Sequence, residues 1–407
     1  MPDSPVAPPR TAWHAPDRAK QLPVATYLTL LRQAVAAAPG RADFELQLAR
    51  ALYHAGLVTE LLQRFGPAAA DAGTHPEMLF HVGCGALSAN DDRLAADALS
   101  SSAAAGFARA HGKLAEALHR ARRYDDALRA GLRALETSPF DFAALRVVAR
   151  TLLARGEKQR LWDVCTELRA RGAWSGYVPS VMVLAATTPE QDEEVAALID
   201  PARWFDAAQL PVVRDFNRRL AAELLAHPAR TALSATKSTS GTGSRIDELE
   251  LAGGPLVREL LGLVRHAVDA YADERKAAVS HPMIAHRPAS AALSSWAVAV
   301  ERDGHEGWHL HPDGWLSGVY YVHVPETDTR AGGRAGAIEF GPHPFAGTRE
   351  DAPWPRRHVA PRAGLLLLFP SYYGHRTWPT GVDEPRLCVA FDVVADALRD
   401  EPPSRAG

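Results

Sequence analysis

The hydrophobic and polar positions follow different periods in the two parts of the chain. From about residue 21 to residue 226 the sequence is rich in Ala, Leu and Arg, its apolar residues recur with a helical period, and β-branched runs are few. Prolines and glycines fall between the periodic segments rather than inside them, as they do in stacked helical hairpins. The pattern predicts an α-helical domain over residues 21–226.

The helical region contains a repeat of the tetratricopeptide (TPR) type. In such repeats small residues let helices approach closely, and large residues fill the space between neighbouring hairpins. A shift of 34 positions relates two sets of residues: Leu114, Ala115, Leu118, Tyr124, Ala127, Gly131, Ala134 and Pro139, and then Val148, Ala149, Leu152, Leu161, Cys165 and Leu168. We therefore expect a TPR-like solenoid that serves as a scaffold or partner-binding surface. A helical domain without true repeats is the alternative.

The pattern changes twice after the helical region. Residues 227–246 are rich in Ser, Thr and Gly, which predicts a linker, and one amphipathic helix with a Gly-Gly-Pro break follows. From Ser294 onward there are short β-branched or aromatic segments between turn residues, namely SSWAVAVE, LSGVYYVHV, GAIEFG, GLLLLFP and RLCVAFDVV. Short strands without intervening helices predict a barrel or jelly roll, here within residues 247–400. Residues 1–20 are expected to be disordered.

Composition narrows the classes of partner and compartment. The 407 residues include 45 basic and 48 acidic ones, a net charge of −3, which gives no overall field for nucleic acid or membrane. The three cysteines lie far apart and form no CxxC pair, which argues against a disulfide framework and fits a reducing compartment. The N-terminus lacks the apolar core of a signal peptide, and no apolar run is long enough to span a bilayer. We expect a cytoplasmic protein.

Two histidine-bearing segments bracket the predicted strands, WHLHPDGWLSGVYYV and FPSYYGHRTWP. Mononuclear iron sites use two imidazoles and usually one carboxylate on one face, and the other face stays open for a chelating cosubstrate and dioxygen. In a strand, period-two spacing points both ligands of an H-x-D motif the same way. His311 and Asp313 form such a motif, and His375 follows 64 residues later. The spacing therefore predicts a site of His311, Asp313 and His375.

Arg386 lies 11 residues beyond His375, at the head of a predicted strand. The planar guanidinium of arginine binds a carboxylate through two parallel hydrogen bonds, which suits the far carboxylate of 2-oxoglutarate. If Arg386 points inward, then Cys388 and Ala390 do so as well, and both are small enough to leave room for a ligand.

Residues 228–396 resemble the 2OG-Fe(II) oxygenases that follow tetratricopeptide repeats in bacterial proteins. The matching stretches are HPARTALSATKSTSGTG, SSWAVAV, HLHPDGWLSGVYYVHVPE, GAIEFG and GLLLLFPSYYGHRTWP with its trailing arginine. The resemblance implies an α+β multidomain chain, with a TPR-like solenoid followed by a double-stranded β-helix of the jelly-roll or cupin type. It also implies Fe(II), 2-oxoglutarate and dioxygen, with 2-oxoglutarate converted to succinate as a substrate C–H bond is hydroxylated.

The family pattern also offers a second ligand set. It reads H-x-H-P-x-G-W-L-S-G and leaves the position of Asp313 free, which implies His309, His311 and His375 as the metal ligands. Because residues 309, 311 and 313 share one face of an extended segment, the spacing itself cannot choose between the two sets.

Other residues are candidates for the surroundings of the metal. Tyr320, Tyr321 and Ser317 could contact the cosubstrate, and Arg376 and Trp296 could contact the substrate, although core packing or solvation is the simpler role for each. The helical repeats suggest a peptide or protein substrate, and a small amino-acid-like molecule is the alternative. A rival interpretation is a catalytically degenerate, cupin-like metal-binding module on a TPR scaffold, which would not need Arg386.

Overall fold

The chain forms two compact units in a computed structural model, and each is described by itself. One unit is residues 18–164, and the other combines residues 1–17 with residues 165–407. The structure describes residues 10–14, 24–71, 73–174, 176–212, 215–233, 239–278, 281–326, 334–341 and 354–396.

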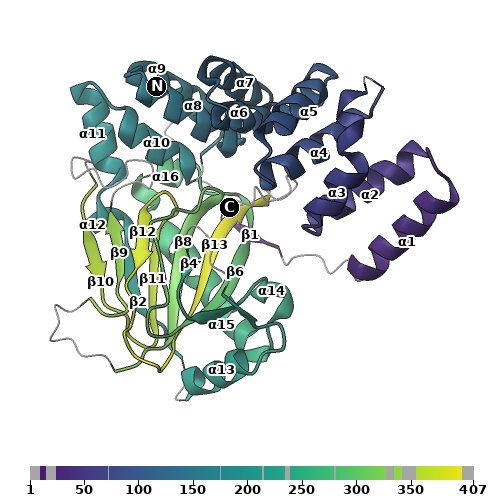
Figure 1. Ribbon diagram of the computed structural model, residues 1–407. Coiled ribbons are helices and arrows are strands. Elements are labelled where there is room, and N and C mark those ends of the chain that lie inside the picture. The colour runs from purple at the N-terminus through teal and green to yellow at the C-terminus, as the bar shows by residue number, and fades with distance from the viewer. Residues whose placement is uncertain are drawn as a thin grey trace. The chain divides into compact units, whose positions relative to one another are not determined.

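The first unit is built from helical hairpins that follow one another in chain order (Figure 1). Its elements are α1 (Val24–Ala37), α2 (Ala42–His54), α3 (Val58–Phe65), the 3-10 helix η1 (Gly66–Ala70), α4 (Pro76–Ser88), α5 (Asp92–Ala104), α6 (Ala110–Arg120), α7 (Tyr124–Thr137), α8 (Phe142–Ala154) and the first part of α9 (Lys158–Ala170). Each α-helix from α1 to α8 packs on the next, so the predicted TPR-like solenoid is confirmed.

Small residues in this unit lie where helices approach closely, as the repeat pattern predicted. A Cβ atom added to Gly131 on α7 would come within 2.8 Å of Val148 Cγ2 on α8. Ala115 and Ala127 are fully buried between neighbouring helices. Tyr124 departs from the pattern: it begins α7 and is 46% exposed, with its ring against His119 rather than in the core.

The second unit combines short helices with β-sheets. After α9 its helices are α10 (Tyr177–Ala185), α11 (Pro189–Leu198), α12 (Pro201–Trp204), α13 (Phe216–Leu225), α14 (Leu249–Ala252), α15 (Pro255–Glu274), the 3-10 helix η2 (Lys276–Ala278) and α16 (Pro282–Ala285). Its strands are β1 (Ala12–Trp13), β2 (Asp206–Gln209), β3 (Thr231–Ala232), β4 (Thr239–Ser240), β5 (Gly243–Ile246), β6 (Ser290–Val300), β7 (His305–Glu306), β8 (Gly314–His323), β9 (Ile338–Gly341), β10 (Arg357–Val359), β11 (Leu365–Pro370), β12 (Gly374–Thr377) and β13 (Arg386–Ala395).

These strands form a large and a small antiparallel sheet together with a two-stranded ribbon. The large sheet has the order β2-β11-β8-β13-β6-β5-β3, and β1 also pairs with β6, in the parallel direction. The small sheet has the order β10-β9-β12, and the ribbon pairs β4 with β7. Strands β8 and β11 are buried on both faces, which explains their continuous apolar sequences.

The five predicted strand segments correspond to β6, β8, β9, β11 and β13, and the Gly-Gly-Pro break separates α14 from α15. The double-stranded β-helix is confirmed.

Several segments outside the predicted β domain belong to the large sheet. β2 lies within the segment expected to be helical and pairs with β11, so the helical unit ends near residue 164 rather than 226. The expected linker 227–246 contains β3 and β5, and β5 pairs with β6. Long-range strand pairing of this kind leaves no signal in local composition.

The expectation of a disordered N-terminus is corrected for residues 10–14. Ala12 and Trp13 pair with the start of β6, Thr11 Oγ1 donates a hydrogen bond to Pro288 O at 2.9 Å, and Trp13 Nε1 donates to an Asp269 carboxylate oxygen at 3.1 Å. The remainder of residues 1–20 lies outside the described residues.

All three cysteines are free and buried, in agreement with the sequence. Within the described ranges, no helix is long and apolar enough to cross a membrane.

Candidate metal centre

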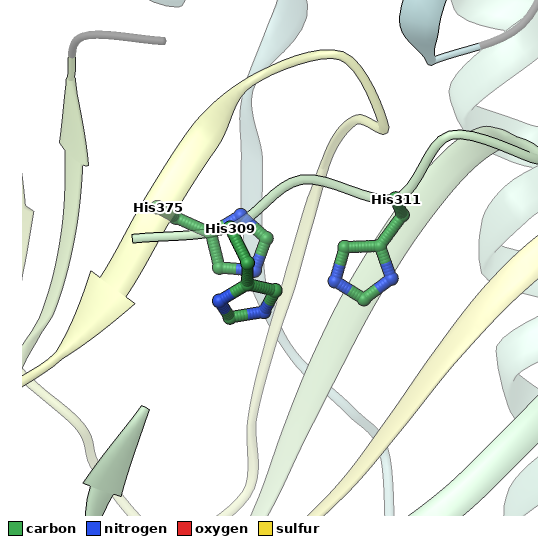
Figure 2. Close-up of side chains that lie close together, drawn as sticks. All are labelled: His309, His311 and His375. Atoms are coloured by element: carbon green, nitrogen blue, oxygen red, sulfur yellow. The ribbon is translucent and has the colours of Figure 1, made fainter. Parts of the chain in front are cut away.

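Three histidines meet at one end of the small sheet. His375 lies on β12, and His309 and His311 lie on the segment that connects β7 to β8. The backbones of His309 and His375 exchange hydrogen bonds of 3.0 and 2.9 Å, which fixes this segment beside β12. One nitrogen from each ring lies within 4.8 Å of the others, and Figure 2 shows the three rings turned toward one another.

Each ring is held from behind through its Nδ1 atom. His309 Nδ1 lies 2.8 Å from Gly307 O, and His375 Nδ1 lies 3.0 Å from Tyr373 O. His311 Nδ1 lies 2.7 Å from Asp392 Oδ2. Because carbonyl and carboxylate oxygens only accept, Nδ1 donates in each case, and in the neutral ring Nε2 then carries the lone pair. Three such nitrogens suit a divalent transition metal.

Burial favours neutral imidazoles at two of these positions. Burial lowers the pKa of His375 well below its usual value, and the neighbouring His309 and His311 lower it further. The pKa of His309 is also lowered by burial, against the opposing charge of Glu306. For His311, burial lowers the pKa, but the adjacent Asp392 carboxylate outweighs it and the net shift is upward.

Asp313, the alternative ligand, is not part of this cluster. Pro312 and Asp313 form a turn in which Gly314 N donates to His311 O at 3.4 Å. The turn ends the extended conformation that would have placed residues 309, 311 and 313 on one face. His309 and His311 keep the spacing that the family pattern implied.

A pocket between the two sheets opens onto the histidines. It encloses about 550 Å³ of empty space, a volume that includes open solvent at its mouth. Alternate residues of β6, β8 and β13 line it, among them Trp296, Ser317, Tyr321, Arg386 and Cys388. Burial raises the pKa of the Cys388 thiol to about 11, so this cysteine stays protonated and acts as a small wall residue.

Among the described lysine and arginine residues, Arg386 is the one that lines this pocket, and its exposed fraction is only 2%. Its Nη1 donates a hydrogen bond to Gly336 O at 2.6 Å, and its buried Nε has no partner. No carboxylate of the described residues forms an ion pair with it. A buried guanidinium without a counter-charge is costly, and an entering carboxylate would satisfy it.

The candidate cosubstrate residues divide between two faces of β8. Tyr321 lines the pocket, and burial raises the pKa of its hydroxyl. Tyr320 points to the opposite face, where its hydroxyl donates to Asn217 Oδ1 at 2.6 Å. Ser317 lines the pocket, but its hydroxyl donates to Asp392 Oδ1 at 2.6 Å. Of the three, Tyr321 is the one that lines the pocket and whose hydroxyl forms no hydrogen bond with another described residue.

The two candidate substrate residues also differ. Trp296 lines the pocket with its ring stacked on His311, at 5.6 Å between centroids, and the Arg245 guanidinium also lies over the Trp296 ring, 4.9 Å from its centroid. Arg376 does not line the pocket. It lies on β12 with its guanidinium 2.7 Å from the buried Glu339 carboxylate and against the Trp308 ring.

Two acidic residues of the centre were not predicted. Asp392 lies on the inward face of β13 together with Arg386, Cys388 and Ala390, so the same period-two argument would have found it. Glu306 also lines the pocket, with Oε2 at 3.2 Å from His309 Nε2. Its backbone N donates to Thr377 Oγ1 at 2.9 Å, and no sequence motif singled it out.

Comparisons with solved structures find distant likenesses. A Pseudomonas putida prolyl-4-hydroxylase is 17% identical, with 49% of this chain and 98% of that one covered at a TM-score of 0.33. The non-heme α-ketoglutarate-dependent epimerase SnoN from nogalamycin biosynthesis is 19% identical, covering 54% and 93% at 0.36. A MamA protein is 17% identical, covering 36% and 80% at 0.32. No curated protein matches the chain.

A family model matches the strands that build the pocket. The match covers residues 294–392, from β6 to β13, and includes the three histidines and Arg386. The family is described as "Putative 2OG-Fe(II) oxygenase". These residues therefore form a domain of the 2OG-Fe(II) oxygenase family, as the sequence motifs indicated.

Proposed function

We propose that this protein is an Fe(II)- and 2-oxoglutarate-dependent dioxygenase that hydroxylates a C–H bond of a peptide, a protein or an amino-acid-like substrate. The observation that carries the proposal is the joint placement, in one pocket, of three inward-facing imidazoles and a buried Arg386 that forms no ion pair with a described residue. A metal and a dicarboxylate would satisfy these two sets of groups together.

The residues present fit the implied metal and cosubstrate. His309, His311 and His375 would hold the metal through Nε2, and Arg386 would bind the far carboxylate of 2-oxoglutarate. Bound iron, 2-oxoglutarate and dioxygen supply the oxidising chemistry, in which decarboxylation to succinate accompanies hydroxylation of the substrate.

The chain itself orients the reactants and limits water. Ile338 and Phe369 give the pocket apolar walls, and Tyr321 and Arg386 place polar groups on its inner side. Trp296 stacks on His311, where it limits the approach of a substrate from that side. A peptide or protein substrate is favoured by the helical unit, because stacked hairpins present extended surfaces.

Succinate release tests this function. Full-length protein reconstituted with Fe(II) should convert 2-oxoglutarate to succinate in air, slowly alone and faster with a true substrate, and a chelator should stop the reaction. His375→Ala is the matched inactive control, because it removes one imidazole from the cluster. Stoichiometric binding of iron and 2-oxoglutarate without succinate under any substrate tested would favour the degenerate metal-binding module instead.

A further inference from the structure

The three imidazoles of the proposed iron site are held by unequal partners. Neutral backbone carbonyls accept from His309 and His375, whereas a carboxylate, Asp392 Oδ2, accepts from His311 at 2.7 Å. A charge-assisted hydrogen bond is roughly twice as strong as a neutral one. The partner of a metal-bound histidine fixes its ring orientation and increases its basicity as a ligand. His311 is thus distinguished from the other two rings.

The Asp392 carboxylate is itself fixed on both oxygens. While Oδ2 accepts from His311, Oδ1 accepts from Ser317 Oγ at 2.6 Å, and Ser317 Oγ lies 2.7 Å from Ser371 Oγ. Both serines are at most 1% exposed. The register of β13 against β8 sets Asp392 opposite Ser317. A Cβ on Gly314 would overlap Ser371 Oγ, so the glycine leaves room for this network.

The hydrogen bond from His311 to Asp392 affects the charge balance around a bound divalent metal. Two imidazoles and a carboxylate would bring one negative charge to a divalent metal. Three neutral imidazoles bring none, and the same pocket is lined by one further charge of each sign, Arg386 and Glu306. Asp392 provides a negative charge one hydrogen bond behind His311.

We propose that Asp392 is a positioning residue that, through His311, takes over the orienting and charge-balancing role of a directly bound carboxylate. This inference rests on the proposed function, because it requires that the three histidines bind a metal. Glu306 has a different relation to the site: its carboxylate lies 3.2 Å from His309 Nε2, on the metal-facing side of that ring rather than behind it.

Metal affinity of the full-length, metal-free protein tests the proposal without turnover. Mn(II) binding is measured by the loss of the free-ion EPR signal, and Co(II) binding by visible absorption, for wild type, Asp392→Asn and Asp392→Ala. Asp396→Asn is the matched control. Asp396 lies just past the end of β13, also accepts a hydrogen bond from a serine, Ser290, and lies 3.4 Å from a histidine, His14, but it does not line the pocket.

Asp392→Asn should weaken Mn(II) binding by about 10- to 100-fold and alter the Co(II) spectrum, and Asp392→Ala should weaken binding at least as much. Asp396→Asn should leave both measurements unchanged. Wild-type affinity and an unchanged Co(II) spectrum in Asp392→Asn would overturn the proposal, even if the melting temperature fell. If the Asp392 variants do not fold, Ser317→Ala decides: it keeps the charge but frees Asp392 Oδ1, so a smaller loss of Mn(II) affinity is expected, and no loss overturns the proposal.

The wild-type protein separates this inference from the proposed function. If it binds neither Mn(II) nor Co(II), both are wrong. If it binds metal with the expected response to Asp392→Asn but never binds 2-oxoglutarate, the positioning role of Asp392 stands and the proposed function fails.

Discussion

Replacing Arg386 with methionine tests whether its guanidinium serves to bind a ligand or to stabilise the fold. Methionine retains an unbranched, apolar stem of similar reach but removes the guanidinium charge and its donors. In the structure the side chain is 2% exposed, donates to Gly336 O and leaves Nε without a partner. If this cation exists to bind 2-oxoglutarate, the substitution should affect binding far more than folding.

The magnitudes follow from the contacts. Losing charge-assisted hydrogen bonds worth about 1.5–3 kcal/mol each should weaken 2-oxoglutarate binding by about 3 kcal/mol, or roughly 100-fold. The ligand-free protein loses one hydrogen bond, about 1 kcal/mol, but no longer buries an unpaired charge. Its free energy of unfolding should therefore fall by no more than about 1 kcal/mol and could rise.

Arg376→Met is the matched control and should behave in the opposite way. Arg376 neighbours the distal histidine in sequence but pairs with Glu339, which is 1% exposed. Its loss weakens a largely buried ion pair, so we expect about 1–3 kcal/mol of destabilisation and unchanged 2-oxoglutarate affinity.

Anaerobic calorimetry with Mn(II)-loaded protein gives the 2-oxoglutarate dissociation constants, and urea unfolding of the ligand-free variants gives their stabilities. The reasoning is refuted if Arg386→Met costs 3–5 kcal/mol of stability and binds 2-oxoglutarate as wild type does. Arg386 would then be a structural residue and the carboxylate anchor would lie elsewhere.

Three further predictions address the ligands, the packing and the pH response. His309→Ala should lose the metal and Asp313→Ala should keep it, as measured by metal content; the reverse result would restore the Asp313 ligand set. Gly318→Ala should destabilise the protein by about 1–3 kcal/mol in urea unfolding, because its Cβ would come within 3.0 Å of Leu367 O and overlap the Phe391 ring. Burial lowers the pKa of His81 from 6.5 to about 4, so the folded state resists protonation, and stability present above pH 6.5 is lost as the pH falls toward 4. Relative to His81→Gln, wild type should therefore lose about 1–2 kcal/mol between pH 7 and pH 5, and equal pH slopes would contradict this assignment.

The sequence by itself determined the elements and most of the chemistry. Helical periodicity and the TPR spacing specified stacked hairpins, and the alternation of apolar residues specified the central strands, because both patterns express which side of an element is buried. The order of His311, His375 and Arg386 on strand-like segments was enough to indicate an iron and 2-oxoglutarate site. The same period of two, extended from Arg386, also reaches Asp392.

Tertiary structure decided what depends on chain direction and long-range pairing. The turn at Pro312 and Asp313 removes Asp313 from the face shared by His309 and His311, and only pairing with β12 fixes that segment. Alternation places Tyr320 and Tyr321 on opposite faces, but the packing of β8 between β11 and β13 decides which face is the pocket. The strands near residues 12 and 206 join the large sheet through partners more than 150 residues away, and no local pattern encodes such a partner.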